Sequence, residues 1–375
     1  MPVRPRAVIE AMEPYRPPSS GRGKKMRLDF NENTVGCSPR VVRRLRKIAA
    51  GELAVYPEYE AALPRIAAYF GVRPDELTLT NGTDEAIQLL VNTYVDPRET
   101  VVLLRPSYAM YRFYAQVAGA RLVEVDYASD LSFPQQALLR AAKAGPKAIF
   151  IANPNNPTGT LAKPAQLQEL LEAAPNAAVM IDEAYFEFSG QTVLPWIARY
   201  KNLFVSRTFS KIYGLAAMRC GCLFSDARNI EKIRKGQSPY SVNSVAVACA
   251  LEAIKDPAYV KRYLREVVRS RQMLCEELDR EGWKYFPSEA NFVLVEFGGV
   301  AREVQRLLGD DDILVRDRSY ELPGCVRITV GTLAQTRRLI DALRRVRRKL
   351  GIPTAKSGES APRNSQGRCR TRAVN

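Results

Sequence analysis

The sequence lacks any apolar run long enough to cross a membrane, because no window approaches eighteen uninterrupted apolar residues. The N-terminal segment, which contains arginine and proline, also lacks the apolar stretch of a secretory signal peptide. The seven cysteines are odd in number and scattered, and none belongs to a C-x-x-C pair. We therefore expect a cytoplasmic protein without membrane contacts, whose cysteines are reduced thiols rather than zinc ligands or disulfides.

The positive charge of the chain is unevenly distributed. The formal net charge is +16, but residues 341–375 hold ten Lys/Arg against two Asp/Glu, so half of the excess lies in the last helix and the tail. The rest is spread over solvated helix faces, such as a basic helix predicted from Pro39, after Ser38 as N-cap, to near Gly51. We expect residues 351–375 to form a disordered basic tail. The charge alone does not indicate a nucleic-acid-binding protein.

Strands and helices alternate through the middle of the sequence. The chain is 46% hydrophobic, and its length allows a large core or two domains. Apolar strands that alternate with helices are typical of a largely parallel sheet covered on both faces. The sequence therefore predicts an α/β fold with ligand residues at the carboxyl ends of its strands. The predicted strands are 77–80, 101–104, 121–125, 148–152, 178–181 and 203–205, and helices are predicted at 108–118 and 164–173.

The segment 202–221 contains one lysine between two hydroxyl residues and an arginine. Thr208, Ser210 and Arg219 surround Lys211, an arrangement that suits a phosphate-bearing ligand whose other end is held by the lysine. A lysine beside another cation can present a free amine, which forms a Schiff base with an aldehyde. Pyridoxal phosphate carries both an aldehyde and a phosphate. The segment therefore predicts a site for this cofactor, with a plain surface lysine as the alternative.

A glycine turn offers a second phosphate-binding element. Asn81 and Gly82 follow the strand predicted at 77–80 and precede a helix that opens at Thr83 or Asp84. The free backbone N–H groups at a helix N-terminus bind phosphate groups. Thr83 as a simple N-cap is the alternative.

Polar residues follow the other predicted strands and suit the cofactor ring. Asp182 can pair with a protonated ring nitrogen, while Asn156 and Tyr185 can donate to the ring hydroxyl. Tyr108 can stack on the ring face. Each has a simpler alternative, since Asp182 can cap a helix, Asn156 can shape a turn and Tyr108 can lie in the core. Their occurrence at successive strand ends favours the cofactor site.

Several motifs resemble one enzyme family. N-G-T-D-E-A-I, P-S-Y-A-M-Y, N-P-N-N-P-T-G, I-D-E-A-Y and R-T-F-S-K-I-Y-G-L-A-A-M-R-C-G resemble the class I/II aminotransferases of fold type I, over roughly residues 10–349. N-E-N-T-V-G-C-S-P and V-R-I-T-V-G-T are most similar to the branch that acts on histidinol phosphate. This resemblance implies an α/β fold type I enzyme with a large, mostly parallel sheet covered by helices and a smaller α+β domain.

The resemblance also implies how the chain is divided. Residues 1–50 would form an N-terminal arm and part of the small domain, 51–255 the large cofactor-binding domain and 256–350 the small C-terminal domain. Within the small domain, the pattern predicts a long helix at 257–281 and strands at 291–295, 313–315 and 326–330.

Roles for the cofactor-site residues follow from the same resemblance. Lys211 would form the Schiff base and move protons, with Asp182 and Tyr185 as further catalytic residues. Tyr56 would reach the cofactor phosphate of a second subunit, so a homodimer is expected. The residues implied to bind pyridoxal 5'-phosphate are Gly82, Thr83, Asp84, Tyr108, Asn156, Asp182, Tyr185, Thr208, Ser210, Lys211, Arg219 and Tyr56.

The substrate-binding residues implied by the resemblance are Tyr15, Asn31, Arg316 and Arg327. Arg327 resembles the arginine that grips a substrate anion throughout the superfamily. A second guanidinium beside it would suit a phosphate or a glutamate side chain, with Tyr15 assisting; a surface ion pair is the alternative for Arg316. The implied reaction converts histidinol phosphate and 2-oxoglutarate to imidazole-acetol phosphate and glutamate.

Three alternatives remain open from the sequence. Two are enzymes of the same superfamily: an aromatic or broad-specificity amino-acid aminotransferase and a phosphothreonine decarboxylase. The third is a cofactor-binding regulatory protein that uses the fold and the positive tail for DNA. The sequence predicts no helix-turn-helix domain before the fold, which disfavours this third alternative.

Overall fold

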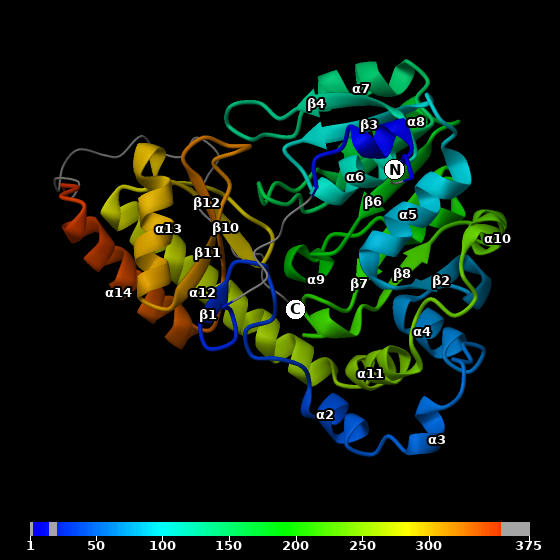
Figure 1. The fold of residues 1–375 in the computed structure, drawn as a ribbon, viewed down its shortest axis with the longest axis horizontal. Helices are drawn as coiled ribbons and strands as arrows, with labels where there is room; N and C mark the ends of the chain where they lie inside the picture. Colours follow the sequence, from blue (N-terminus) through cyan, green and yellow to red (C-terminus); the bar gives the residue numbers. More distant parts are fainter. Residues whose placement is uncertain (1–2, 15–20, 354–375) are drawn as a thin grey trace.

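The computed structural model describes residues 3–14 and 21–353, which contain two sheets, each with its own helices (Figure 1). The larger sheet has the strand order β2-β8-β7-β6-β5-β3-β4. Its neighbours are parallel except that β8 runs antiparallel to β2 and β7. The predicted α/β fold with a mostly parallel sheet is confirmed. The strands are β2 (Leu77–Thr80), β3 (Thr100–Arg105), β4 (Arg121–Asp126), β5 (Ala148–Ala152), β6 (Ala178–Asp182), β7 (Leu203–Thr208) and β8 (Gly221–Phe224).

Helices cover both faces of this sheet because its strands are apolar on both sides. Along β6, Ala178 and Met180 belong to one hydrophobic cluster, whereas Val179 and Ile181 belong to another on the opposite face. The first cluster includes α5 (Gly82–Tyr94), α6 (Ala109–Val117) and α10 (Ala227–Gly236). The second includes α4 (Leu63–Phe70), α7 (Gln135–Lys143), α8 (Pro164–Ala173) and α11 (Ser244–Ile254). The short elements are α1 (Ala7–Glu10), α9 (Phe186–Ser189), η1 (Pro74–Glu76), η2 (Leu194–Ala198) and η3 (Ala216–Met218).

The smaller sheet has the order β1-β11-β12-β10-β9 and is antiparallel except for the β1–β11 pair. Its strands are β1 (Met26–Leu28), β9 (Lys284–Phe286), β10 (Phe292–Glu296), β11 (Ile313–Asp317) and β12 (Cys325–Thr329). The helices beside it are α12 (Pro257–Glu281), α13 (Ala301–Asp310) and α14 (Leu333–Lys349), with η4 (Gly298–Val300). The segment that follows β1 contacts the chain that follows β7 of the larger sheet, because Nδ2 of Asn33 donates to the backbone carbonyl of Ile212 at 3.0 Å.

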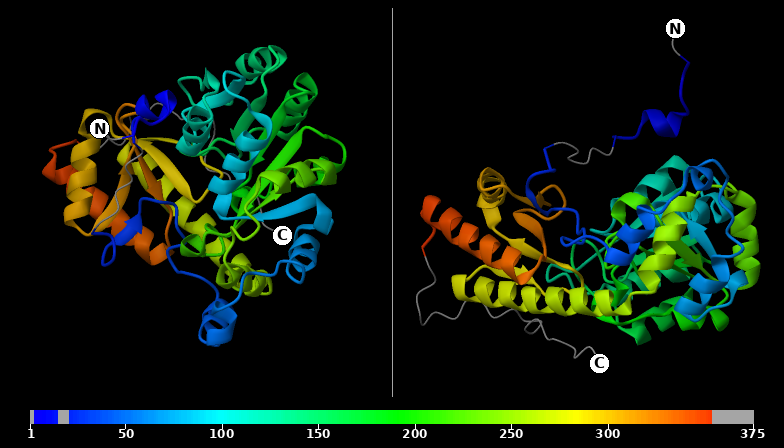
Figure 2. Two further views of the ribbon diagram at one scale, coloured as in Figure 1. Left: turned by 45° about the vertical axis from the view of Figure 1, so that its right-hand side comes forward. Right: turned by 90° about the horizontal axis from the view of Figure 1, so that it is seen from below.

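Helix α12 joins the two parts of the molecule, as the right-hand view in Figure 2 shows. Asp256 caps its N-terminus by accepting the backbone N–H of Tyr259 at 3.1 Å, and the Ser38 hydroxyl donates to the same carboxylate. The Tyr263 hydroxyl accepts the backbone N–H of Thr34 at 3.3 Å. The segment that follows β1 is therefore fastened to the first two turns of α12.

The predicted strands of the parallel sheet and the predicted helix 257–281 are confirmed, but the basic helix predicted to run to Gly51 is wrong. It ends at Leu45 as α2 (Pro39–Leu45), and a separate turn, α3 (Ala50–Leu53), follows. Only Val41 of α2 is buried, and like charges three and four residues apart repel, so packing does not extend the helix.

Other predictions are not tested by the structure. The division of the chain into arm, large and small domain remains a prediction, and residues 354–375 of the predicted basic tail lie outside the described residues. Within 3–14 and 21–353, no helix combines the length and hydrophobicity that a bilayer span requires.

Candidate active site

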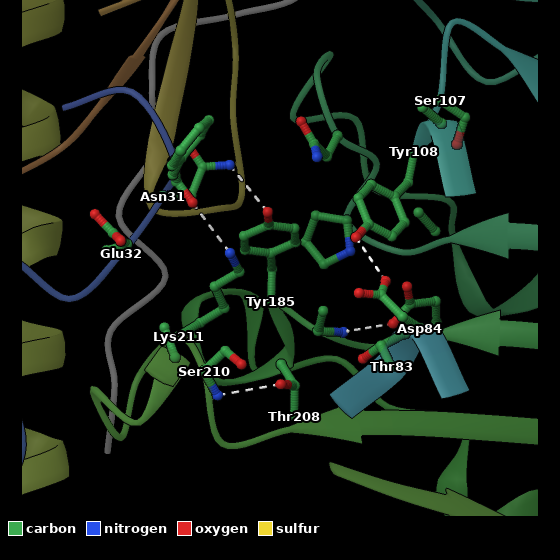
Figure 3. Close-up of a pocket in the computed structure, with 18 of the residues that line it drawn as sticks. Asn31, Glu32, Thr83, Asp84, Ser107, Tyr108, Tyr185, Thr208, Ser210 and Lys211 are labelled. Carbon is green, nitrogen blue, oxygen red and sulfur yellow. Dashed lines mark hydrogen bonds between the residues drawn. The ribbon is translucent and has the colours of Figure 1, made fainter. Parts of the chain in front are cut away.

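A pocket of about 520 Å³ lies at the carboxyl ends of β5, β6 and β7, and residues of the smaller sheet complete it (Figure 3). Parallel strands bring residues that are distant in sequence to one edge. The lining residues are Phe30, Asn31, Glu32, Thr83, Asp84, Ser107, Tyr108, Ala109, Ala152, Pro154, Asn156, Asp182, Ala184, Tyr185, Thr208, Ser210, Lys211, Ala216, Arg219, Arg316, Arg318 and Arg327.

Asp182 is the buried carboxylate at the end of β6. It accepts hydrogen bonds from the Tyr111 hydroxyl at 2.7 Å, the Ser206 hydroxyl at 2.8 Å and the backbone N–H of Ala184 at 3.1 Å. Burial raises the pKa of Asp182, and these hydrogen bonds oppose that shift. A cationic group bound beside Asp182 would favour its charged form, as a protonated pyridine nitrogen does.

The N-terminus of α5 forms a cradle with Arg219. Gly82 has a φ of +75°, and a Cβ atom there would lie 2.6 Å from Nη2 of Arg219, so only glycine allows this approach. The hydroxyl of Thr83 is buried and has no hydrogen-bond partner among the described residues. Nearby, the Thr208 hydroxyl accepts the backbone N–H of Ser210 at 3.1 Å. Helix N–H groups, hydroxyls and a guanidinium together suit a phosphate.

Asp84 connects this cradle to the aromatic wall. The Tyr108 hydroxyl donates to one carboxylate oxygen at 2.7 Å, and Arg219 donates to the other at 3.1 Å. Burial and the adjacent Asp84 charge raise the pKa of Tyr108 well above its ordinary value, so the phenol stays protonated and acts as the donor. These contacts hold the Tyr108 ring in the pocket wall.

Lys211 lines the pocket. Its Nζ donates to the backbone carbonyl of Phe30 at 3.1 Å and lies 5.7 Å from the centroid of the Tyr185 ring. The Tyr185 hydroxyl in turn accepts from Nδ2 of Asn31 at 2.9 Å. Asn31 and Arg219 both adopt left-handed backbone conformations, with φ of 56° and 52°. Such conformations are costly for non-glycine residues and cluster at functional sites.

Two arginines face the pocket from the smaller sheet. Arg316 and Arg327 are directly opposite each other in the β11–β12 ladder. Arg327 donates to Oδ1 of Asn156 and to the carbonyl of Asp29, and its Nε has no partner within the described ranges. Burial, with the nearby guanidinium groups of Arg318 and Arg316, lowers the pKa of Arg327 to about 10. The pocket thus holds buried positive charge with little compensation.

The structure brings nearly all predicted site residues together. Tyr56 is the exception: it is 74% exposed, lies outside this pocket and stacks on Tyr240 with ring centroids 4.5 Å apart. Gly82 contacts Arg219 at the edge of the pocket. Tyr15 lies outside the described residues. The predicted residues that line the pocket are Asn31, Thr83, Asp84, Tyr108, Asn156, Asp182, Tyr185, Thr208, Ser210, Lys211, Arg219, Arg316 and Arg327.

The sequence analysis missed four residues. Arg318 follows Arg316 by two positions, and this spacing on a strand was the available signal for a second pocket arginine. Glu32 and Phe30 line the pocket within the segment that supplied Asn31. Tyr111 binds Asp182 from a different helix, and no local pattern marks such a long-range contact.

Comparisons with known proteins agree with this geometry. Residues 23–343 match the family described as aminotransferase class I and II. This chain belongs to that family. As a class I/II aminotransferase, the enzyme is a transaminase that uses pyridoxal 5'-phosphate. The Thr83 hydroxyl, which has no partner in the described part of the chain, the Gly82–Arg219 cradle and buried Asp182 fit the phosphate and the ring nitrogen of that cofactor.

Relatives of this aminotransferase cover almost the whole chain. A histidinol-phosphate aminotransferase of Symbiobacterium thermophilum is 37% identical over 357 residues, which is 90% of this chain and 97% of the relative. That of Geobacillus sp. (strain WCH70) is 35% identical over 355 residues, 89% and 96% of the two chains. The crystal structure of histidinol-phosphate aminotransferase from Sinorhizobium meliloti, in complex with pyridoxal-5'-phosphate, superposes with a TM-score of 0.83. It is 27% identical and covers 92% of this chain and 98% of its own.

Proposed function

We propose that this aminotransferase transfers the amino group of histidinol phosphate to 2-oxoglutarate, giving imidazole-acetol phosphate and glutamate. The observation that carries this proposal is the pair of opposed pocket arginines, Arg316 and Arg327, for which the described residues provide no ion-pair partner. Histidinol phosphate has no carboxylate, so both guanidinium groups can bind its doubly charged phosphate. The names of the two relatives above support the same substrate.

The pocket residues divide between holding the cofactor and handling the proton. Pyridoxal 5'-phosphate supplies an aldehyde that takes up the amino group and a ring that withdraws electrons from the reacting carbon. Asp182 would hold the ring nitrogen, Asn156 and Tyr185 the ring oxygen, and Tyr108 the ring face. The residues proposed to hold the cofactor phosphate are Gly82, Thr83, Thr208, Ser210 and Arg219.

Lys211 is the proposed catalytic base and acid. Its Nζ lies 3.1 Å from the Phe30 carbonyl oxygen and 5.7 Å from the centroid of the Tyr185 ring, and Lys211 lines the pocket. From this position it would remove the proton from the substrate carbon that bears the amine and deliver it to the carbon on the far side of the amine nitrogen. A positioned amine at this point contributes roughly 10²–10⁴-fold to proton transfer. The chain contains no histidine, so no imidazole competes for this role.

The second part of the proposal is a cytoplasmic homodimer. Tyr56 does not reach the pocket of its own chain, and it is surrounded by the exposed apolar side chains of Leu53, Val55 and Tyr240. Exposed apolar side chains gathered in one region mark an interaction surface. Tyr56 of the partner subunit would complete the cofactor phosphate site. In Tyr56→Phe we expect weaker cofactor retention in gel filtration, and a monomeric, fully active protein would contradict the dimer.

A half-reaction tests the substrate. The holoenzyme is mixed separately with histidinol phosphate, phenylalanine and glutamate, and the absorbance of the bound cofactor is followed as its aldehyde becomes an amine. We expect conversion by histidinol phosphate at far lower concentration than by phenylalanine. In the variant Arg316→Ala, the loss of activity should be largest with doubly anionic substrates. A preference for phenylalanine would move the enzyme to the aromatic aminotransferases and leave Arg316 without its proposed ligand.

The remaining alternatives have their own tests. The structure of L-threonine-O-3-phosphate decarboxylase from Porphyromonas gingivalis is 23% identical and shares the fold alone, with a TM-score of 0.75. Release of carbon dioxide from phosphothreonine would support a decarboxylase. Binding of duplex DNA that is sensitive to salt, and that disappears when residues 351–375 are removed, would support the regulatory alternative.

A further inference from the structure

The loop between β11 and β12 carries a third arginine of the substrate pocket. Arg318 follows Arg316 by two residues, so both side chains lie on the same face of the extended chain. Arg318 lines the pocket with Arg316 and Arg327 and is 7% exposed. Its backbone is fixed, because its N–H donates to Cys325 at 2.9 Å and its carbonyl accepts the N–H of Glu321 at 2.9 Å.

The Arg318 guanidinium is only partly satisfied. Nη2 forms an ion pair with Glu321, and the group lies 5.0 Å from the centroid of the Tyr320 ring. Nε is buried and has no hydrogen-bond partner within residues 3–14 and 21–353. A buried N–H of a charged group without a partner costs free energy. An acceptor supplied by a ligand would remove that cost.

Glu321 holds Arg318 from outside the pocket. With Tyr320 and Leu322, it lines a neighbouring cavity of about 630 Å³, which shares Ser107 and Tyr108 with the substrate pocket. The Arg318–Glu321 pair therefore lies in the wall between the two cavities. Glu321 keeps some contact with water, whereas Arg318 is buried and lines the substrate pocket.

We infer that Arg318, positioned by Glu321, is a specificity-determining residue that binds the phosphate group of the amino donor. This inference rests on the proposed function and extends it to a residue not among the predicted ligands. A phosphate monoester has three terminal oxygens and close to two negative charges, whereas a carboxylate has two oxygens and one charge. Arg316 and Arg327 suffice for carboxylates. Arg318 supplies the donors for the additional oxygen and charge.

The test compares Arg318→Gln with wild-type holoenzyme. Inorganic phosphate and succinate are titrated separately by calorimetry, and KM and kcat are measured for histidinol phosphate and for glutamate. We expect the phosphate Kd and the histidinol phosphate KM to rise by about ten- to a hundredfold, as for a lost hydrogen bond to a charged group. The succinate Kd and the glutamate KM should change less than about threefold, and kcat should be retained.

Two further variants control for folding and for general charge. Arg306→Gln removes an arginine from an exposed i,i+3 ion pair with Glu303, and it should leave every constant unchanged. The double variant Arg318→Gln with Glu321→Gln removes the whole ion pair without leaving an unpaired carboxylate. It should reproduce the selective loss of phosphate binding even if the single variant is unstable.

The outcomes separate this inference from the proposed function. The wild-type enzyme could fail to convert histidinol phosphate and yet bind inorganic phosphate in a manner that depends on Arg318. In that case the proposed function fails and the assignment of Arg318 stands. If wild type prefers histidinol phosphate and the Arg318 variants bind phosphate normally, the assignment fails and the function stands. Equal losses for phosphate and succinate would also overturn the assignment, because Arg318 would then not discriminate between the two anions.

Discussion

The two walls of the pocket differ in how well their polar groups are satisfied. On the wall from the larger sheet, Asp182 accepts three hydrogen bonds, and the next residue, Glu183, which is not part of the pocket lining, forms a buried ion pair with Arg207 at 2.7 Å. On the wall from the smaller sheet, Arg316 faces Arg327 directly, and two buried Nε groups have no partner among the described residues. We propose that the first wall is pre-organised to hold the cofactor, whereas the second leaves positive charge for the substrate anion.

Loss of Lys211 should have the largest effect, because this lysine serves both walls. In Lys211→Ala we expect turnover to fall by roughly 10³-fold or more, since the proton has no other carrier. Cofactor should remain bound through the satisfied wall and be detectable by absorbance after gel filtration. Lys201→Ala, at an exposed ion pair with Asp226, is the matched control. Substantial residual turnover in Lys211→Ala would show that the assigned role is wrong.

Glu187, in the short helix α9 that follows Tyr185, gives a pH-dependent prediction. Burial raises the pKa of Glu187 to about 7, and the charge of Arg207 opposes that shift only in part. The unfolded chain therefore releases this proton at lower pH than the folded one. The contribution of Glu187 to the free energy of unfolding is full below about pH 4.5 and falls as pH rises to about 7, by at most about 3 kcal/mol.

Urea denaturation of wild type and Glu187→Gln between pH 4.5 and 8 measures this effect. The stability difference between the two proteins should shift in favour of the glutamine variant as pH rises. The absence of histidine means that no imidazole titrates in the same range. If the free energies of unfolding of the two proteins changed in parallel with pH, the raised pKa of Glu187 would be contradicted.

Removal of one hydrogen bond on the satisfied wall should destabilise the protein. Tyr111→Phe leaves Asp182 without one of its buried donors, and we expect the free energy of unfolding to fall by about 1–2 kcal/mol. Tyr114→Phe, on the same helix, is a suitable control because no hydrogen bond of the Tyr114 hydroxyl is found in the described chain. Equal stability of the two variants would show that the contact with Asp182 contributes nothing.

Removal of a charge on the wall from the smaller sheet should raise the free energy of unfolding, and this is the smallest of the predicted effects. Arg316→Gln relieves repulsion between like charges opposite each other on neighbouring strands, so stability should rise by about 0.5 kcal/mol. Arg302→Gln, which changes an exposed side chain of α13, should leave stability unchanged. Thermal unfolding without substrate measures the difference. A loss of stability in Arg316→Gln would mean that Arg316 makes stabilising contacts, so that the polar groups of both walls are equally well satisfied.

The sequence predicted the satisfied wall better than the other. Apolar strands with Asn156, Asp182 and Lys211 at or shortly after their ends are local patterns, and parallel pairing then brings these ends together without further information. Arg316 and Arg327 came from a family resemblance, and Arg318 was missed although the i,i+2 spacing was present. The contact of Tyr111 with Asp182 depends on how a helix packs on the sheet, which no short stretch of sequence specifies.

Helix α12 can transmit a rotation from one part of the molecule to the other, because it contacts both. A helix of this length extends over about 37 Å, so a tilt of roughly 5° at its Asp256 end moves the other end by about 3 Å. The N-terminal turns of α12 are hydrogen-bonded to the segment that follows β1. The helix also packs against β9 of the smaller sheet and against α14 beside that sheet. A small rotation at Asp256 would therefore move the arginine wall by ångströms relative to the wall from the larger sheet.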